Sequence, residues 1–235
     1  MLTSAGLTDQ ELERLLGFIG YGRMDAPVWF LGMEEAGGGE ENLRARLEFE
    51  PVEDLARAHR LLGITKHHEG RKAIQPTWRG MCYVMLKLRG RETDVESIRR
   101  YQAERLGRFG GETLLCEMMP IPKPRVGSWG YEEVIPQFRS AEEYYRRVKP
   151  KREGLLRRVI QQNKPCVVVG YGKGYWEAYQ RLFLERRFKR EGAFLVSGER
   201  LPLVVLTPHF ASRAMNYQWE NLVVLMSRYV DAKVG

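Results

Sequence analysis

The chain has 235 residues, 43% of them hydrophobic and 11% aromatic, which is enough for one domain with a buried core and too few for two large ones. No apolar run approaches the roughly 20 residues that a membrane-spanning helix needs. The amino terminus is acidic where a secretion signal would be basic and then apolar. We therefore expect a monomeric, cytoplasmic protein without a membrane partner.

The net charge is unevenly distributed along the chain. It totals +8, yet residues 139–190 hold 15 Lys and Arg against 5 Glu, so this segment carries +10 and the remainder −2. Such a segment suits a polyanion such as nucleic acid. An ordinary solvated helical face is the alternative interpretation.

Cysteine and histidine spacing argues against a disulfide framework and a metal centre. Cys82, Cys116 and Cys166 are isolated and odd in number, so we predict buried thiols. The pair His67 and His68 has no Cys or His partner at metal-ligand spacing, and we interpret it as part of a solvated loop. We expect no metal and no small-molecule cofactor.

The first half of the chain is predicted to be mostly helical. A capping box at Thr8 and Glu11 opens a first helix, and an apolar strand follows at 27–31. The glycine-rich segment 32–39 then predicts a turn. Three further helices are expected at 52–62, 77–88 and 93–106. We interpret them as a helical insertion at about 50–108 within a single domain that spans 1–235.

The second half alternates strands and helices. A strand at 113–116 is followed by a rigid loop, because three prolines punctuate 117–124. A helix capped by Ser140 is interrupted at Pro150 and resumes at 152–162. The remaining elements are strands at 166–169 and 203–206 and helices at about 175–185 and 213–229.

Four short apolar strands separated by helices predict an α/β protein. The expected architecture is a three-layer α/β/α sandwich with a central four-stranded parallel sheet. In such a sheet, ligands bind at the carboxyl ends of the strands. Two polar turns, 32–39 and 207–213, follow strands, so we expect their side chains to share one crevice.

The turn after the first strand carries a recognisable motif. Its sequence, Gly32-Met33-Glu34-Glu35-Ala36-Gly37, resembles the Gly-x-Asp/Asn and Gly-Glu-Ala-Pro-Gly motifs of the uracil-DNA glycosylase superfamily. That resemblance implies that Glu34 in one register, or Glu35 in the other, positions the attacking water; Glu34 is favoured. Ala36, followed by Gly37, Gly38 and Gly39, stands where the resemblance implies a bulky Tyr in the most uracil-selective branch, so a larger group at C5 of the pyrimidine would fit.

The turn after the second strand departs from the family. Glu117 stands where the resemblance implies an Asn that reads the base edge. A carboxylate can only accept hydrogen bonds, which suits the exocyclic amino group of cytosine. If burial keeps Glu117 protonated, it can also donate to the ring nitrogen and help the base to leave. An exposed glutamate at the start of a loop is the alternative.

The turn after the fourth strand is similar to the family's His-Pro-Ser-x-x-Ser motif. Here Thr207 takes the His place and His209 the first Ser place. Positions 207 and 209 point the same way in an extended segment, so His209 is the candidate for stabilising negative charge on the base. Tyr171 and Trp129 are candidates for stacking on the base, and the candidates for a wedge in the emptied stack are Phe210, Arg213 and Met215.

The resemblance implies a monofunctional DNA glycosylase that flips out and excises a modified pyrimidine. The superfamily includes defence enzymes that attack hypermodified cytosine, such as glucosylated hydroxymethylcytosine in phage DNA, and Glu117 favours that branch. Uracil excision in repair and a catalytically silent nucleic-acid-binding relative are the alternatives. A nucleotide-binding enzyme is a further alternative, but the glycine-rich run at 170–174 lacks the glycine spacing that a nucleotide-binding loop requires. The expected phosphate-binding residues are Arg146, Arg147, Arg157, Arg158, Ser212 and Arg213.

Overall fold

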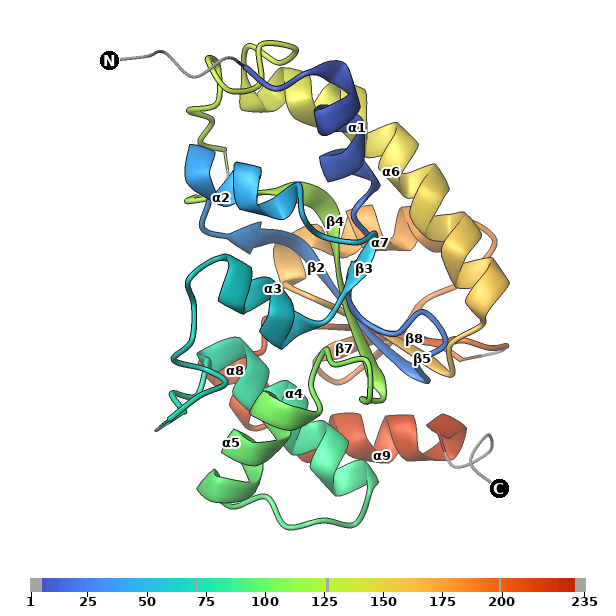
Figure 1. Cartoon of the computed structure of the whole chain (residues 1–235). Coiled ribbons are helices and arrows are strands. Elements are labelled where there is room, and N and C mark those ends of the chain that lie inside the picture. The colour runs from blue at the N-terminus through green and yellow to red at the C-terminus, as the bar shows by residue number, and fades with distance from the viewer. Residues whose placement is uncertain (1–5, 71, 126, 199, 231–235) are drawn as a thin grey trace.

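The computed structural model describes residues 6–70, 72–125, 127–198 and 200–230 (Figure 1). The fold is α/β. Within these residues the strands form one mixed sheet of eight strands in the order β3-β1-β4-β2-β5-β8-β7-β6. Their bounds are β1 (Gly20–Gly22), β2 (Val28–Ala36), β3 (Val52–Glu53), β4 (Thr113–Lys123), β5 (Val167–Tyr171), β6 (Lys189–Glu191), β7 (Phe194–Ser197) and β8 (Leu203–Thr207).

The centre of the sheet is parallel. Strands β4, β2, β5 and β8 pair side by side in that order and in the same direction, and they contain the four predicted strands. The sheet is nevertheless wider than predicted, because β1 pairs antiparallel with β4 and the β6–β7 hairpin pairs antiparallel with β8. The additional strands are two to four residues long, too short to give a periodic signal.

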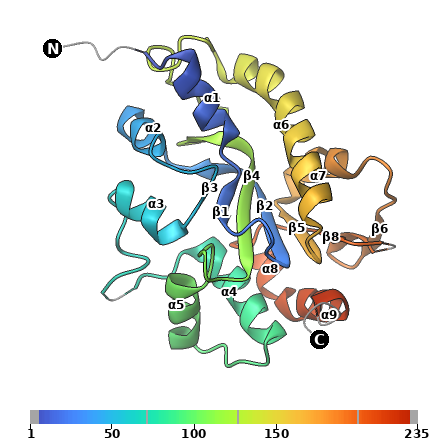
Figure 2. The same ribbon diagram turned by 45° about the vertical axis from the view of Figure 1, so that its right-hand side comes forward.

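Helices cover both faces of the sheet (Figures 1 and 2). Trp29 and Leu31 pack into one buried cluster, whereas Val28 and Phe30 pack into the other, as expected when successive side chains of a strand point to opposite faces. One face carries α1 (Asp9–Gly17), α2 (Glu40–Arg46), α6 (Ala141–Asn163) and α7 (Trp176–Gln180), which short 3-10 turns flank at Lys173–Tyr175 and Arg181–Phe183. The other carries α3 (Leu55–Leu61), α4 (Pro76–Leu88), α5 (Val95–Glu104), α8 (Arg213–Asn216) and α9 (Trp219–Val230).

Two predicted turns prove to be strand. The residues expected as a turn from 32 onward continue β2 as far as Ala36, and the proline-rich residues expected as a loop continue β4 as far as Lys123. The register between these two strands shifts between Glu34 and Ala36. Proline is tolerated in a sheet where pairing is irregular. Strand β4 therefore continues through its prolines, and its pairing with β2 is irregular there.

The long helix α6 was predicted as two pieces but is continuous through Pro150. A proline inside a helix removes one hydrogen bond and costs about 3 kcal/mol. The helix buries residues three or four apart on both sides of the proline, from Tyr144 and Val148 to Leu156 and Ile160. Burying several such side chains at about 1.5–3 kcal/mol each outweighs the proline.

The remaining differences are smaller. The helix predicted at 52–62 begins with strand β3, and the closing helix divides into α8 and α9. The three thiols are free and buried, as predicted. The histidine pair is not simply a solvated loop, since His68 Nε2 lies 3.0 Å from His59 Nδ1 beside Trp78. In the described part of the chain, no helix has the length and apolarity to cross a bilayer.

Candidate active site

Glu117, which lies inside β4, meets Tyr171, the last residue of β5. The Tyr171 hydroxyl donates to Glu117 Oε1 at 3.1 Å. Gly32, opposite Glu117 on β2, makes this contact possible, since a Cβ there would lie 2.0 Å from Glu117 Oε2 and 2.4 Å from the Tyr171 oxygen. The glycine that opens the sequence motif therefore serves to admit a carboxyl and a phenol from the two neighbouring strands.

The Glu117 carboxyl has unusual electrostatics. Burial, and next the charge of Glu35, raise its pKa to about 8, although the hydrogen bond from Tyr171 opposes the shift. Its Oε2 is buried and has no hydrogen-bond partner among the described residues. The buried Arg152 donates to the main-chain oxygen of Glu117 at 2.9 Å and not to the side chain. A pKa of about 8 favours the protonated acid at neutral pH, and Oε2 can then form a hydrogen bond with a ligand.

Glu35 is held by a buried arginine and a buried tyrosine. Arg46 Nη2 lies 2.9 Å from Glu35 Oε2, and the Tyr21 hydroxyl donates to the same oxygen at 2.8 Å. Burial, followed by the charge of Glu35, raises the pKa of Tyr21 well above its usual value, so the hydroxyl remains a donor. Arg46 also donates through Nε to Asn42 Oδ1 at 2.8 Å and packs over the ring of Phe49.

Glu34 also contacts one phenol and one cation, which come from α6 and β4. The Tyr145 hydroxyl of α6 donates to Glu34 Oε2 at 2.5 Å, and Lys123 Nζ lies 3.3 Å from the same oxygen. Lys123 is fully buried and donates to the Tyr145 hydroxyl at 2.7 Å. Glu34 Oε1 is buried without a hydrogen-bond partner in the described chain. Each of the two adjacent glutamates is therefore paired with one cation and one phenol.

The loop after β8 meets these residues through Tyr171. The ring of His209 lies 5.5 Å from that of Tyr171, and desolvation lowers the pKa of His209, so the ring is neutral at neutral pH and can donate to a base oxygen. Thr207 is buried, and its hydroxyl donates to the Pro208 carbonyl at 2.9 Å. His209 and Glu117 therefore share Tyr171 as a neighbour.

The three residues proposed to fill the gap left by a flipped base differ in their exposure to solvent. Phe210 is fully buried and packs edge-on against Phe30 and Tyr171, so its expected contact with DNA is wrong for this conformation. Met215 is buried as well. Arg213 is exposed at the start of α8, where Ser212 is the cap and accepts from Met215 N at 3.3 Å. Arg213 is the wedge candidate that remains at the surface.

The expected phosphate-binding arginines lie along α6. Arg146, Arg147 and Arg158 are exposed, whereas Arg157 is partly buried and donates to the Arg181 carbonyl at 3.0 Å. Arg147 also donates to the Gln137 carbonyl at 2.7 Å. Trp129, the second stacking candidate, donates to the Phe138 carbonyl at 3.0 Å and packs among aromatic rings, which is a core role.

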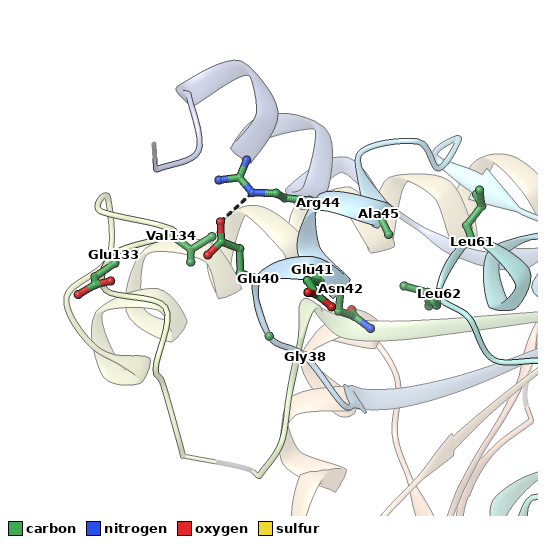
Figure 3. Close-up of a pocket in the computed structure, with 11 residues that line it drawn as sticks. Gly38, Glu40, Glu41, Asn42, Arg44, Ala45, Leu61, Leu62, Glu133 and Val134 are labelled. Carbon is green, nitrogen blue, oxygen red and sulfur yellow. Dashed lines mark hydrogen bonds and ion pairs between the residues drawn. The ribbon is translucent and has the colours of Figure 1, made fainter. Parts of the chain in front are cut away.

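A hollow of about 1050 Å³ begins at the glycines that follow Ala36 (Figure 3). Gly37, Gly38 and Gly39 all have positive φ, a conformation that glycine adopts without strain. The Gly39 amide donates to the Tyr131 hydroxyl at 3.1 Å. The other polar and apolar residues of the hollow come from α2, α3 and the segment before α6, and they are Glu40, Glu41, Asn42, Arg44, Ala45, Leu61, Leu62, Glu133 and Val134.

Several residues of the site had no signal in the sequence. Lys123 lies in a run that its prolines marked as loop, and Arg46 follows the glycines in a helix of seven residues. Their carboxylate partners were visible, but the partnerships depend on tertiary contacts. No model of a known protein family matches this chain, and no curated protein sequence is significantly similar to it.

Proposed function

We propose that this protein is a hydrolase of N-glycosidic bonds. The observation that supports it best is that two carboxyls on adjacent strands, Glu117 of β4 and Glu35 of β2, lie close enough for the charge of Glu35 to act on Glu117. Glu117 has its pKa raised to about 8, whereas Glu35 is ion-paired with Arg46. A protonated carboxyl beside a carboxylate that is ion-paired with an arginine supplies the acid and the anion that glycoside hydrolysis needs.

In the proposed reaction, water attacks C1′ of the sugar while the bond from C1′ to the base nitrogen breaks. The electron pair of that bond leaves with the base, which receives a proton or a hydrogen bond from Glu117. One glutamate of the β2 motif, Glu34 or Glu35, stabilises the sugar cation and accepts the proton of the water. Neutral His209 donates to the base oxygen. The products are the free base and an abasic sugar.

The proposed substrate is DNA, and the enzyme is a DNA glycosylase that flips its target base out of the stack. The basic segment 139–190, with +10, and the exposed arginines of α6 support a polyanionic partner. The strand-end motifs support it through their resemblance to the uracil-DNA glycosylase superfamily, whose fold would be matched here by the parallel centre of the sheet.

The proposed target is a modified pyrimidine, in particular a hypermodified cytosine such as glucosylated hydroxymethylcytosine in phage DNA. The open space at Gly37 and Gly39, where a Cβ would meet nothing within 4 Å, supports room for a substituent on C5. Glu117 supports the cytosine edge, because its carbonyl oxygen accepts from the amino group and its proton is donated to the ring nitrogen.

Uracil is the second candidate base, and the protonation of Glu117 is the observation that favours it. A protonated carboxyl has a donor and an acceptor, as an Asn amide has. It can therefore donate to O4 of uracil and accept from the ring N–H. The neutral acid accommodates either base, whereas the carboxylate accommodates only cytosine.

The test is release of base from oligonucleotides containing uracil, hydroxymethylcytosine or glucosylated hydroxymethylcytosine, read out as alkali-labile abasic sites. We expect cleavage of a modified cytosine by the wild type and none by Glu117→Ala prepared in the same way, which excludes a contaminating enzyme. Binding to all oligonucleotides without release from any would indicate a catalytically silent relative.

A further inference from the structure

We propose that Glu35, not Glu34, is the carboxylate that acts on the sugar and the attacking water, and that Arg46 and Tyr21 are positioning residues that fix it in place. This inference rests on the proposed glycosylase function. It decides between two adjacent glutamates of one motif, and it adds two residues that no motif contains.

Accessibility separates the two glutamates. The Glu35 side chain is 26% exposed, whereas that of Glu34 is 5% exposed. Both oxygens of Glu34 are withdrawn, since Oε2 receives Tyr145 and Lys123 and Oε1 is buried. A carboxylate enclosed in this way cannot reach a sugar without a rearrangement of α6. Glu35 needs none.

The neighbourhood of Glu117 also favours Glu35. Among the charges that act on the Glu117 carboxyl, that of Glu35 has the larger effect and that of Glu34 the smaller. The acid that serves the leaving base and the anion that serves the sugar must face one nucleotide from nearby positions. The register shift between Glu34 and Ala36 gives the two glutamates different surroundings despite their adjacency.

The partners of Glu35 position it through one of its two carboxylate oxygens. Arg46 and Tyr21 both contact Oε2, so the second oxygen is not needed to fix the side chain. Arg46 Nη1 also donates to the Tyr21 hydroxyl at 3.2 Å, so the two buried partners of Glu35 are joined to each other as well. Asn42 and the ring of Phe49 then fix the guanidinium itself.

Such a hold has a catalytic consequence. An ion pair set before substrate arrives needs no reorganisation when positive charge develops on the sugar. If the hydroxyl of Tyr21 or the fork of Arg46 is removed, the carboxylate can rotate and the rate of the chemical step should fall. Because these residues do not contact the DNA, the affinity for DNA should stay the same.

The experiment compares Tyr21→Phe, Arg46→Lys and Glu35→Gln by single-turnover base release and by DNA affinity. We expect Tyr21→Phe to slow release about tenfold, the effect of one hydrogen bond to a charged group, with affinity within twofold. Glu35→Gln should slow release at least a hundredfold, and Glu34→Gln much less. Arg46→Lys retains the charge without the fork and should fall between wild type and Glu35→Gln.

The matched control is Tyr101→Phe. Tyr101 is a buried tyrosine that donates to Glu112 Oε1 at 3.0 Å, and Arg89 pairs with that carboxylate at 3.0 Å. The triad is of the same kind, but Glu112 comes just before the amino end of β4, whereas Glu117 lies inside the strand. We expect this variant to release base at the wild-type rate.

A double-mutant cycle separates positioning from a loss of structure. If Tyr21 acts through Glu35, adding Tyr21→Phe to Glu35→Gln should slow release no further. Fully additive effects, or a Glu34→Gln variant slower than Glu35→Gln, would overturn the inference while leaving the proposed function intact. A wild-type protein that releases no base would overturn both. Circular dichroism at the assay temperature verifies that each variant is folded.

Discussion

The proton on Glu117 should be visible as a pH dependence of stability. In the folded protein the pKa of Glu117 is about 8, against its usual 4.5. Between these values the folded state holds a proton that the unfolded chain releases, so stability falls as pH rises. The loss is complete above the folded value, and the relevant window is therefore the interval from pH 4.5 to about 8.

The size of the effect follows from the shift. Each pH unit in this window costs about 1.4 kcal/mol, so raising the pH from 6 to 9 should remove about 3 kcal/mol. For a chain of this length, 1 kcal/mol corresponds to about 2–4 °C in the unfolding midpoint. Glu117→Gln has no proton to lose, and its amide retains a donor and an acceptor for Tyr171. The variant should therefore gain about 6–12 °C on the wild type over this pH range.

The assay is thermal unfolding of wild type and Glu117→Gln at pH 6, 7, 8 and 9, with Glu132→Gln as the control at an exposed glutamate. Other titrating groups affect all three proteins equally, so the difference between curves isolates Glu117. Parallel curves for wild type and Glu117→Gln would refute the reasoning, since Glu117 would then be ionised throughout.

Three further predictions concern the site and the surface. Gly32→Ala should abolish base release and destabilise the fold by about 1–3 kcal/mol, because its Cβ would lie 2.0 Å from Glu117 Oε2; wild-type rate and midpoint would contradict the close approach. Glu117→Asn keeps a donor and an acceptor but has no acidic proton for the departing base, so it should slow base release in steady-state assays, and an unchanged rate would remove Glu117 from the acid role. Neutralising the arginines of α6 should weaken DNA binding alike for all sequences and flatten its salt dependence, whereas an unchanged slope would indicate a solvated face; these are Arg146, Arg147, Arg157 and Arg158.

The sequence by itself determined the centre of the fold. Runs such as Val28 to Leu31 and Leu203 to Leu206 are almost entirely apolar, which is the pattern of strands buried on both faces. All four predicted strands lie in the parallel centre, and the caps at Thr8 and Ser140 begin helices. The sequence also indicated that Glu117, Tyr171 and His209 follow or end these strands, and parallel strands bring such positions to one edge.

Only the tertiary structure decided what each of these residues does. The flanking strands are only two to four residues long, so their pairing depends on an existing sheet edge. Pro150 continues a helix because the packing on both sides outweighs one lost hydrogen bond. Glu34 and Glu35 are adjacent and identical in sequence, yet one turns to Lys123 and the other to Arg46. Burial and long-range contacts set their roles, and neither quantity is present in local sequence.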